Sequence, residues 1–166
     1  MSLVMSTSHR LLRTLSTRSL LFNTPSRYSS SNGSQVLCEL KRDGQVAVLT
    51  LNSPAKLNAL SEEMGDELTD HVMKLKENAT LRCCVLTGAG KAFSAGGDLA
   101  FLMDRHNDTP DNNIRVMKAF YKRFLCVRQL PVPVIGAING PAVGAGFCLG
   151  MFYLHPIIKN NSVELF

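Results

Sequence analysis

The chain has 166 residues, of which 45% are hydrophobic and 19% charged, so it is long enough for one globular domain and too apolar to be disordered. Its formal net charge of +5 would suit a nucleic-acid-binding protein. However, four arginines lie within residues 1–34, and no acidic residue precedes Glu39. The basic charge therefore belongs mostly to this leader, and we expect no nucleic-acid partner.

The leader, residues 1–34, is rich in Ser, Thr, Leu and Arg and free of acidic residues. Leu11, Leu12 and Leu15 lie between arginines, which suits a basic amphipathic helix. This composition is typical of an organelle transit peptide, and the regular arginine spacing favours the mitochondrion over the plastid. We predict a mitochondrial transit peptide and linker over 1–34 and location in the mitochondrial matrix. A disordered basic tail is the alternative.

Cysteine spacing argues against a disulfide framework or a zinc site, because the count is odd and no two cysteines are separated by two residues. The five are Cys38, Cys83, Cys84, Cys126 and Cys148. We expect free thiols and no bound metal.

Two short strands are predicted over residues 36–41 and 45–52, and Asp43-Gly44 between them is a hairpin signal. The second strand is apolar at nearly every position, which predicts a sheet that is covered on both faces.

A helix is predicted to begin after Ser61, which suits an N-cap, and to run to about Lys76. Its apolar side chains recur at spacings of four, four and three, which predicts one buried stripe made of Met64, Leu68, Val72 and Leu75.

Two more strands are predicted over residues 82–87 and 133–138. A second amphipathic helix lies between them, marked by Ile114, Met117, Phe120, Tyr121, Phe124 and Leu125. Alternating strands and helices of this kind indicate a layered α/β fold. Residues 130–154 carry no formal charge and could span a bilayer, which takes about 20 residues. Their prolines and glycines suit strands and turns better, so no membrane span is expected.

Two glycine-rich turns, residues 87–99 and 139–149, each follow an apolar strand. Neither matches a nucleotide-phosphate motif. Ala92 stands where a P-loop needs Ser or Thr, and Phe93 and Leu149 occupy the third glycine positions of a dinucleotide fingerprint. Backbone N–H groups from two such turns could converge on one carbonyl oxygen and stabilise negative charge there. From the pattern alone, they could equally be tight strand-to-helix turns.

Three segments together resemble the crotonase (enoyl-CoA hydratase/isomerase) superfamily. Residues 91–99, with the sequence KAFSAGGDL, resemble its first oxyanion-hole motif, and residues 133–146, PVIGAINGPAVGAG, resemble its second. Residues 52–60, NSPAKLNAL, resemble the loop that contacts coenzyme A. The segments stand in the family's order and are separated in a family-like way.

The resemblance implies a fold of repeated ββα units and acyl-CoA thioester substrates, as in fatty-acid or branched-chain amino-acid breakdown. It implies that the backbone N–H groups of Ala95 and Ala145 hold an enolate-like oxygen. Coenzyme A would enter as part of the substrate, with no covalently bound cofactor. The resemblance places substrate and coenzyme A contacts at Ala55, Lys56, Gly96, Gly97, Asp98 and Gly144. Asp98 could instead simply cap the following helix.

The chain departs from the family where hydratases carry two catalytic glutamates. Cys148 occupies the position of the first, and the second would lie beyond Phe166. We expect a crotonase-like α/β core over 35–150, truncated at its C-terminal side, and a divergent tail over 151–166. Two functions remain open. One is an enoyl-CoA hydratase or isomerase; the other is a catalytically inactive isoform that binds acyl-CoA or joins homo-oligomers or mixed oligomers with a full-length form.

Overall fold

The computed structural model describes residues 33–152 and 155–158. The predicted transit peptide lies outside the described residues except for Gly33 and Ser34, and so does most of the predicted tail. In chain order the elements are β1 (Val36–Lys41), β2 (Val46–Leu51), the 3-10 turn η1 (Pro54–Lys56), α1 (Glu62–Lys76), β3 (Cys83–Gly88), α2 (Leu99–His106), α3 (Pro110–Leu125), the 3-10 turn η2 (Cys126–Gln129), β4 (Val134–Ile138), α4 (Ala145–Phe152) and β5 (His155–Ile158).

The strands form one sheet in the order β1-β2-β3-β4-β5. β1 and β2 are antiparallel, and every later pair is parallel. The predicted hairpin is confirmed: Arg42, Asp43 and Gly44 all have positive φ, at 51°, 56° and 84°. Asp and Gly tolerate this region of backbone space better than other residues do, which is why the turn forms there.

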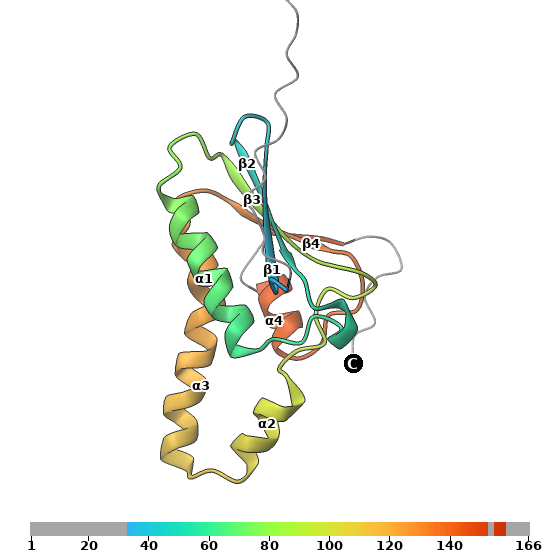
Figure 1. Cartoon of the computed structure of the whole chain (residues 1–166), viewed down its shortest axis with the longest axis vertical. Helices are drawn as coiled ribbons and strands as arrows, with labels where there is room; N and C mark the ends of the chain where they lie inside the picture. The colour runs from blue at the N-terminus through green and yellow to red at the C-terminus, as the bar shows by residue number, and fades with distance from the viewer. Residues whose placement is uncertain (1–32, 153–154, 159–166) are drawn as a thin grey trace, which may run out of the picture.

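Helix α1 packs against β1 and β2, and α3 lies beside α1 (Figure 1). The predicted apolar stripe of α1 is confirmed, because its four members are all buried. The helix begins as predicted after Ser61, whose hydroxyl oxygen accepts a hydrogen bond from the backbone N–H of Met64 at 3.2 Å. The stripe packs into a core shared with β2, β3 and α3, including Leu49, Leu86 and Phe120.

Only one face of β2 is fully buried within the described residues. Ala47, Leu49 and Leu51 face the core, whereas Val46 and Val48 on the other face are partly exposed. We predicted that both faces of the sheet would be covered. In the described residues, only the face of β2 that points to the core is fully covered.

Strand β5 extends the sheet into the segment that was predicted to be a divergent tail. It pairs in parallel with β4, from Ile135 opposite His155 to Ile138 opposite Ile158, and its four residues are exposed. The sequence pattern missed this strand because it is short, contains Pro156 and is defined by pairing with β4.

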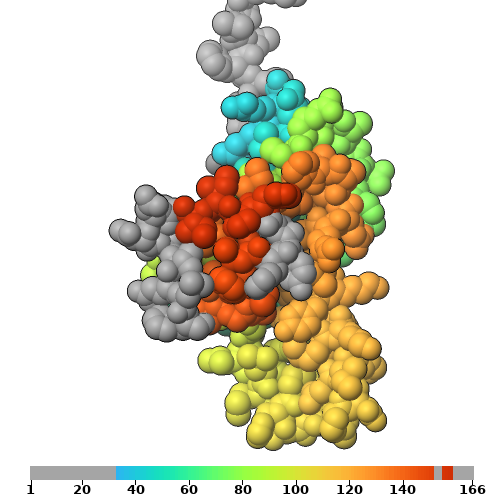
Figure 2. Space-filling model, turned by 180° about the vertical axis from the view of Figure 1, so that it is seen from behind, coloured from blue at the N-terminus to red at the C-terminus, as the bar shows by residue number. Residues whose placement is uncertain are grey.

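Helix α2 and the first turns of α3 project away from the sheet (Figures 1 and 2), whereas α4 lies near the last turns of α3, with which it lines a cavity. Within residues 33–152 and 155–158, no helix has both the length and the apolar character needed to cross a bilayer. The uncharged segment 130–154 instead contains a strand, a turn and a short helix.

We expect Leu68→Ala to lower the free energy of unfolding by about 2–5 kcal/mol, because Leu68 is fully buried and the shorter side chain leaves a cavity. Urea denaturation of the full chain measures this change. Met73→Ala is the control on the same helix, because Met73 is 48% exposed and should change stability by no more than about 0.5 kcal/mol. Equal losses for the two variants would contradict the placement of the α1 stripe.

Candidate functional site

The two glycine-rich turns lie side by side because a parallel bridge joins Ser94 in the first to Ala142 in the second. Its two backbone hydrogen bonds measure 3.2 and 3.0 Å. Gly97 and Ala145 each lie three residues beyond the bridge, so the bridge brings the ends of the two turns close together.

The turns approach each other so closely that side chains are excluded between them. A Cβ added at Gly96 would lie 2.8 Å from the carbonyl oxygen of Val143 and 3.6 Å from the backbone nitrogen of Ala145. Gly96 also has a φ of +92°, a conformation that other residues rarely adopt. A Cβ at Gly146 would lie 2.6 Å from the Cβ of Ser94. Glycine at these positions is thus a requirement of packing.

A second parallel bridge holds the first turn against the loop that precedes α1. The N–H of Leu60 donates to the carbonyl of Gly96 at 2.7 Å, and the N–H of Asp98 donates to the carbonyl of Leu60 at 3.0 Å. In such a bridge the central residue, here Gly97, directs its own N–H away from its partner. No acceptor among the described residues lies within hydrogen-bonding distance of this N–H.

The N–H of Ala145 is likewise without an acceptor in the described part of the chain. Ala145 is the first residue of α4, and the first N–H groups of a helix have no partner within the helix. The following N–H groups bond back to the turn, with Gly146 and Phe147 both donating to the carbonyl of Val143. The Ala145 N–H is therefore available to a ligand, at the positive end of the helix dipole.

The structure corrects the prediction for Ala95. Its N–H donates to the carbonyl of Leu57 at 2.9 Å, so it has no proton to offer a substrate oxygen. The N–H of Gly97, which the family resemblance places only among the coenzyme A contacts, has no acceptor among the described residues and can serve as the donor instead. The sequence could not distinguish these two neighbours, because the bridge to Leu60 decides which N–H groups are used internally.

An apolar cavity of about 380 Å³ lies next to Ala145. Its walls come from Leu60 and from helices α3 and α4, and include Phe120, Phe124 and Cys148. None of the residues that line it carries a carboxylate. Such a cavity suits the apolar part of a ligand whose polar group reaches the backbone donors.

A polar pocket of about 520 Å³ lies on the other side of the Leu60 bridge and contains Lys56 and Asp98. The ammonium of Lys56 is 3.2 Å from Asp98 Oδ2. Asp98 also caps α2 by accepting hydrogen bonds from Ala100 N and Phe101 N, which confirms the capping alternative. The hydrogen bond from Lys56, reinforced by those two amides, lowers the pKa of the Asp98 carboxyl below its ordinary value.

The two remaining residues predicted to contact the substrate or coenzyme A, Ala55 and Gly144, do not line the polar pocket. Ala55 is exposed on η1, outside the residues that line the polar pocket. Gly144 has a φ of +52°, and a Cβ added there would meet nothing within 4 Å. Gly144 therefore shapes the second turn and leaves open space beside it.

Sequence analysis missed Asn58, a fully buried amide that connects the first loop to the first turn. Its Oδ1 accepts from Ser53 N at 2.9 Å, and its Nδ2 donates to the carbonyls of Ala89 and Ala92, both at 2.9 Å. A φ of +55°, which Asn adopts more readily than most residues, fits it to this position.

Asn139, directly after β4, connects the second turn to the first in the same way. Its Oδ1 accepts from Gly88 N at 3.0 Å, and its Nδ2 donates to the carbonyl of Gly90 at 3.1 Å. Asn58 and Asn139 each bond to three backbone groups. Their place beside the turns could have suggested a structural role, but the sequence could not show which groups they bond. Throughout the described ranges, no group of three or more His, Cys, Asp or Glu side chains is placed to hold a metal ion.

Comparison with known proteins relates this chain to one family. The family described as Enoyl-CoA hydratase/isomerase matches residues 41–163, so the resemblance does not stop at residue 150. The chain is 39% identical over 110 residues to 1,2-epoxyphenylacetyl-CoA isomerase from Escherichia coli, covering 64% of this chain and 41% of that protein. It thus spans about two fifths of the length of that relative.

Solved structures show the same fold. Enoyl-CoA hydratase from Bacillus anthracis is 31% identical with a TM-score of 0.66, over 78% of this chain and 49% of that one. Enoyl-CoA hydratase from Polaromonas sp. JS666 is 29% identical with a TM-score of 0.67, over 76% and 49%. These likenesses confirm the predicted crotonase-like α/β fold.

We expect Asn58→Ala to lower the free energy of unfolding by about 3 kcal/mol, because each buried backbone group left without a partner costs about 1–3 kcal/mol. Urea denaturation measures the loss. Asn107→Ala is the matched control, because Asn107 is exposed and its amide makes only a 3.5 Å contact with the carbonyl of Met103. A loss at Asn58 no larger than at Asn107 would show that the amide does not hold the turns together.

Proposed function

Because this chain belongs to the enoyl-CoA hydratase/isomerase family, we propose that it binds an acyl-CoA thioester and polarises the thioester carbonyl between the backbone N–H groups of Gly97 and Ala145. The observation that carries the proposal is that both N–H groups lack an acceptor among the described residues, in two turns held in register by one bridge.

The chemistry that two such donors supply is stabilisation of negative charge on oxygen. Removing a proton beside a thioester, or adding a nucleophile to a conjugated double bond, moves charge onto the carbonyl oxygen. Backbone donors fixed before the reaction need no reorganisation, and losing one of them costs about 2.7–4 kcal/mol in comparable sites. The start of α4 adds its dipole at the same place.

The two cavities divide the ligand between them. The apolar cavity beside Ala145 takes the acyl group, because hydrocarbon gains most from leaving water there. The polar pocket at Lys56 and Asp98 takes an uncharged stretch of the coenzyme A moiety, which is bound as part of the substrate. Glu62, Glu63 and Asp104 also line this pocket and would repel a phosphate group. Gly144, where an added Cβ would meet nothing within 4 Å, leaves room for the thioester to reach the main chain.

A second candidate function, an acyl-CoA-binding module without catalysis, is favoured by Cys148. This thiol lines the apolar cavity where an enzyme of the family would need a group that exchanges protons, and no carboxylate is among the lining residues. A hydration assay with crotonyl-CoA distinguishes the enzyme from the binding module. The loss of the enoyl-thioester absorbance measures the reaction. Turnover above the uncatalysed rate supports an enzyme, whereas binding without turnover supports the module.

We also propose import into the mitochondrial matrix, on the acid-poor, Arg-rich composition of residues 1–34. Uptake of the full chain into isolated mitochondria, with an intact mass that shows cleavage within the leader, would support it. A chain that stays outside and uncleaved would refute it.

We expect Ala145→Pro to weaken binding of butyryl-CoA by up to about tenfold, because it removes one hydrogen-bond donor. It should also shift the infrared carbonyl band of bound, carbonyl-labelled butyryl-CoA back toward its position in water. Proline is well tolerated at the first position of a helix, so α4 should remain intact.

Ala145→Ser is the matched control for this substitution, because it changes the side chain and keeps the N–H. It should retain both the affinity and the carbonyl shift of the parent chain. If Ala145→Pro binds and polarises the thioester as well as Ala145→Ser does, the Ala145 N–H is not a donor and the proposal is wrong.

A further inference from the structure

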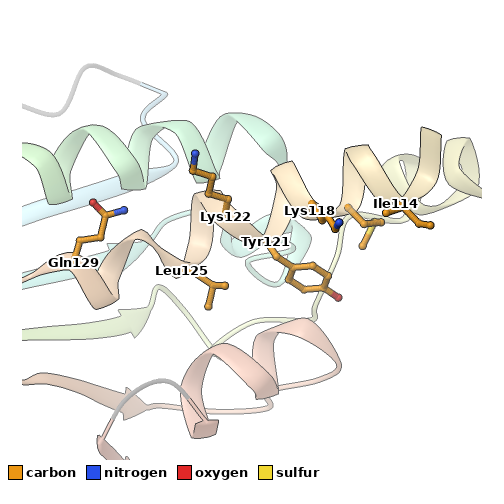
Figure 3. Close-up of a pocket in the computed structure, with 7 residues that line it drawn as sticks. Ile114, Lys118, Tyr121, Lys122, Leu125 and Gln129 are labelled. Atoms are coloured by element: carbon orange, nitrogen blue, oxygen red, sulfur yellow. The ribbon is translucent and has the colours of Figure 1, made fainter. Parts of the chain in front are cut away.

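The apolar cavity beside Ala145 adjoins a second pocket of about 410 Å³ on the outer face of α3 (Figure 3). Tyr121 and Leu125 line both. In Figure 3 these two side chains project from the side of α3 that faces α4. The two pockets are therefore neighbours that meet along one helix.

The second pocket follows a single stripe of α3. Ile114, Met117, Tyr121 and Leu125 recur at spacings of three and four and so share one face of the helix. From Ile114 to Tyr121 the stripe runs for two helical turns, about 10 Å. Lys118 borders the pocket and can cover part of it with an apolar stem while its ammonium remains in water.

Large apolar side chains in this stripe face water. Ile114 is 55% exposed and Tyr121 is 44% exposed, whereas the other face of α3 buries Phe120 and Phe124 in the core. Exposed apolar strips of this kind mark surfaces that a partner, a membrane or a ligand covers. Continuity with the cavity beside Ala145, through the shared Tyr121 and Leu125, favours a ligand.

Tyr121 stands at the boundary between the two pockets. Its ring packs edge-on against Phe120, with the ring centroids 5.6 Å apart. Its hydroxyl makes no hydrogen bond to another described residue. No hydrogen bond therefore fixes the hydroxyl of Tyr121 at this boundary.

We propose that the two pockets form one acyl channel and that the site takes long, unbranched acyl chains. The carbons next to the thioester fill the cavity beside Ala145, and the tail passes Tyr121 and lies along Met117 and Ile114. A short acyl chain would reach only the first cavity and leave the outer stripe in water. This inference rests on the proposed function and names the substrate class of the same site.

The test is calorimetric binding of butyryl-, octanoyl- and dodecanoyl-CoA to the full chain, below the concentrations at which the longer thioesters aggregate. Affinity should rise along the series by up to about fourfold for each methylene buried, and the rise should continue from octanoyl to dodecanoyl. Ile114→Asp, at the far end of the channel, should weaken dodecanoyl-CoA binding by about tenfold or more and leave butyryl-CoA binding unchanged.

Met73→Asp is the matched control, because it places the same charge on an exposed methionine of α1 that lines neither pocket. It should leave the whole series unchanged. Equal affinities for octanoyl- and dodecanoyl-CoA would overturn the inference while butyryl-CoA binding preserves the proposed function. Equal effects of Ile114→Asp and Met73→Asp on binding would also overturn the inference. A changed sedimentation of Ile114→Asp with unchanged binding would overturn it too, because a second copy of the chain would then cover the stripe. Failure to bind any of the three thioesters would overturn both.

Discussion

Ser94 is fully buried and ties together the three segments from which the candidate site is built. Its hydroxyl donates to the carbonyl of Asn58 at 2.8 Å and accepts from the N–H of Gly96 at 3.2 Å. Its backbone makes both hydrogen bonds of the bridge to the second turn. A buried hydroxyl and peptide group must find partners, so the loop before α1 and both turns are drawn to one point. The N–H groups of Gly97 and Ala145 are not consumed by these internal bonds.

Side chains are almost absent from the place where the turns meet, and this follows from the same closeness. A Cβ added at Gly140 would lie 2.0 Å from the carbonyl oxygen of Lys91, and one at Gly88 would lie 2.3 Å from that of Ala92. Such contacts cannot be relieved by rotating a side chain, because they are made with the main chain. The site is thus formed by backbone geometry, and the surrounding cavities supply the apolar and polar surroundings of a ligand.

Much of the framework could be predicted from local pattern. The Asp43-Gly44 hairpin and the α1 stripe depend on turn chemistry and helical periodicity, which the sequence displays directly. The two turns were also recognisable. The choice between Ala95 and Gly97 was not, because it depends on which N–H groups a bridge from Leu60 consumes. The partners of Asn58 and the pairing of β5 likewise arise between segments that are distant in sequence.

The pairing that the Ser94 bridge imposes makes segment length critical as well as composition. A residue inserted between Ser94 and Gly97, or between Ala142 and Ala145, would displace one donor relative to the other by up to about 3.8 Å, the spacing of consecutive Cα atoms. That distance exceeds the latitude of a hydrogen bond, so the two N–H groups could no longer meet on one oxygen. Substitutions that preserve the backbone path and its N–H groups leave the donors in place, whereas a single-codon insertion or deletion in either stretch would abolish the pair.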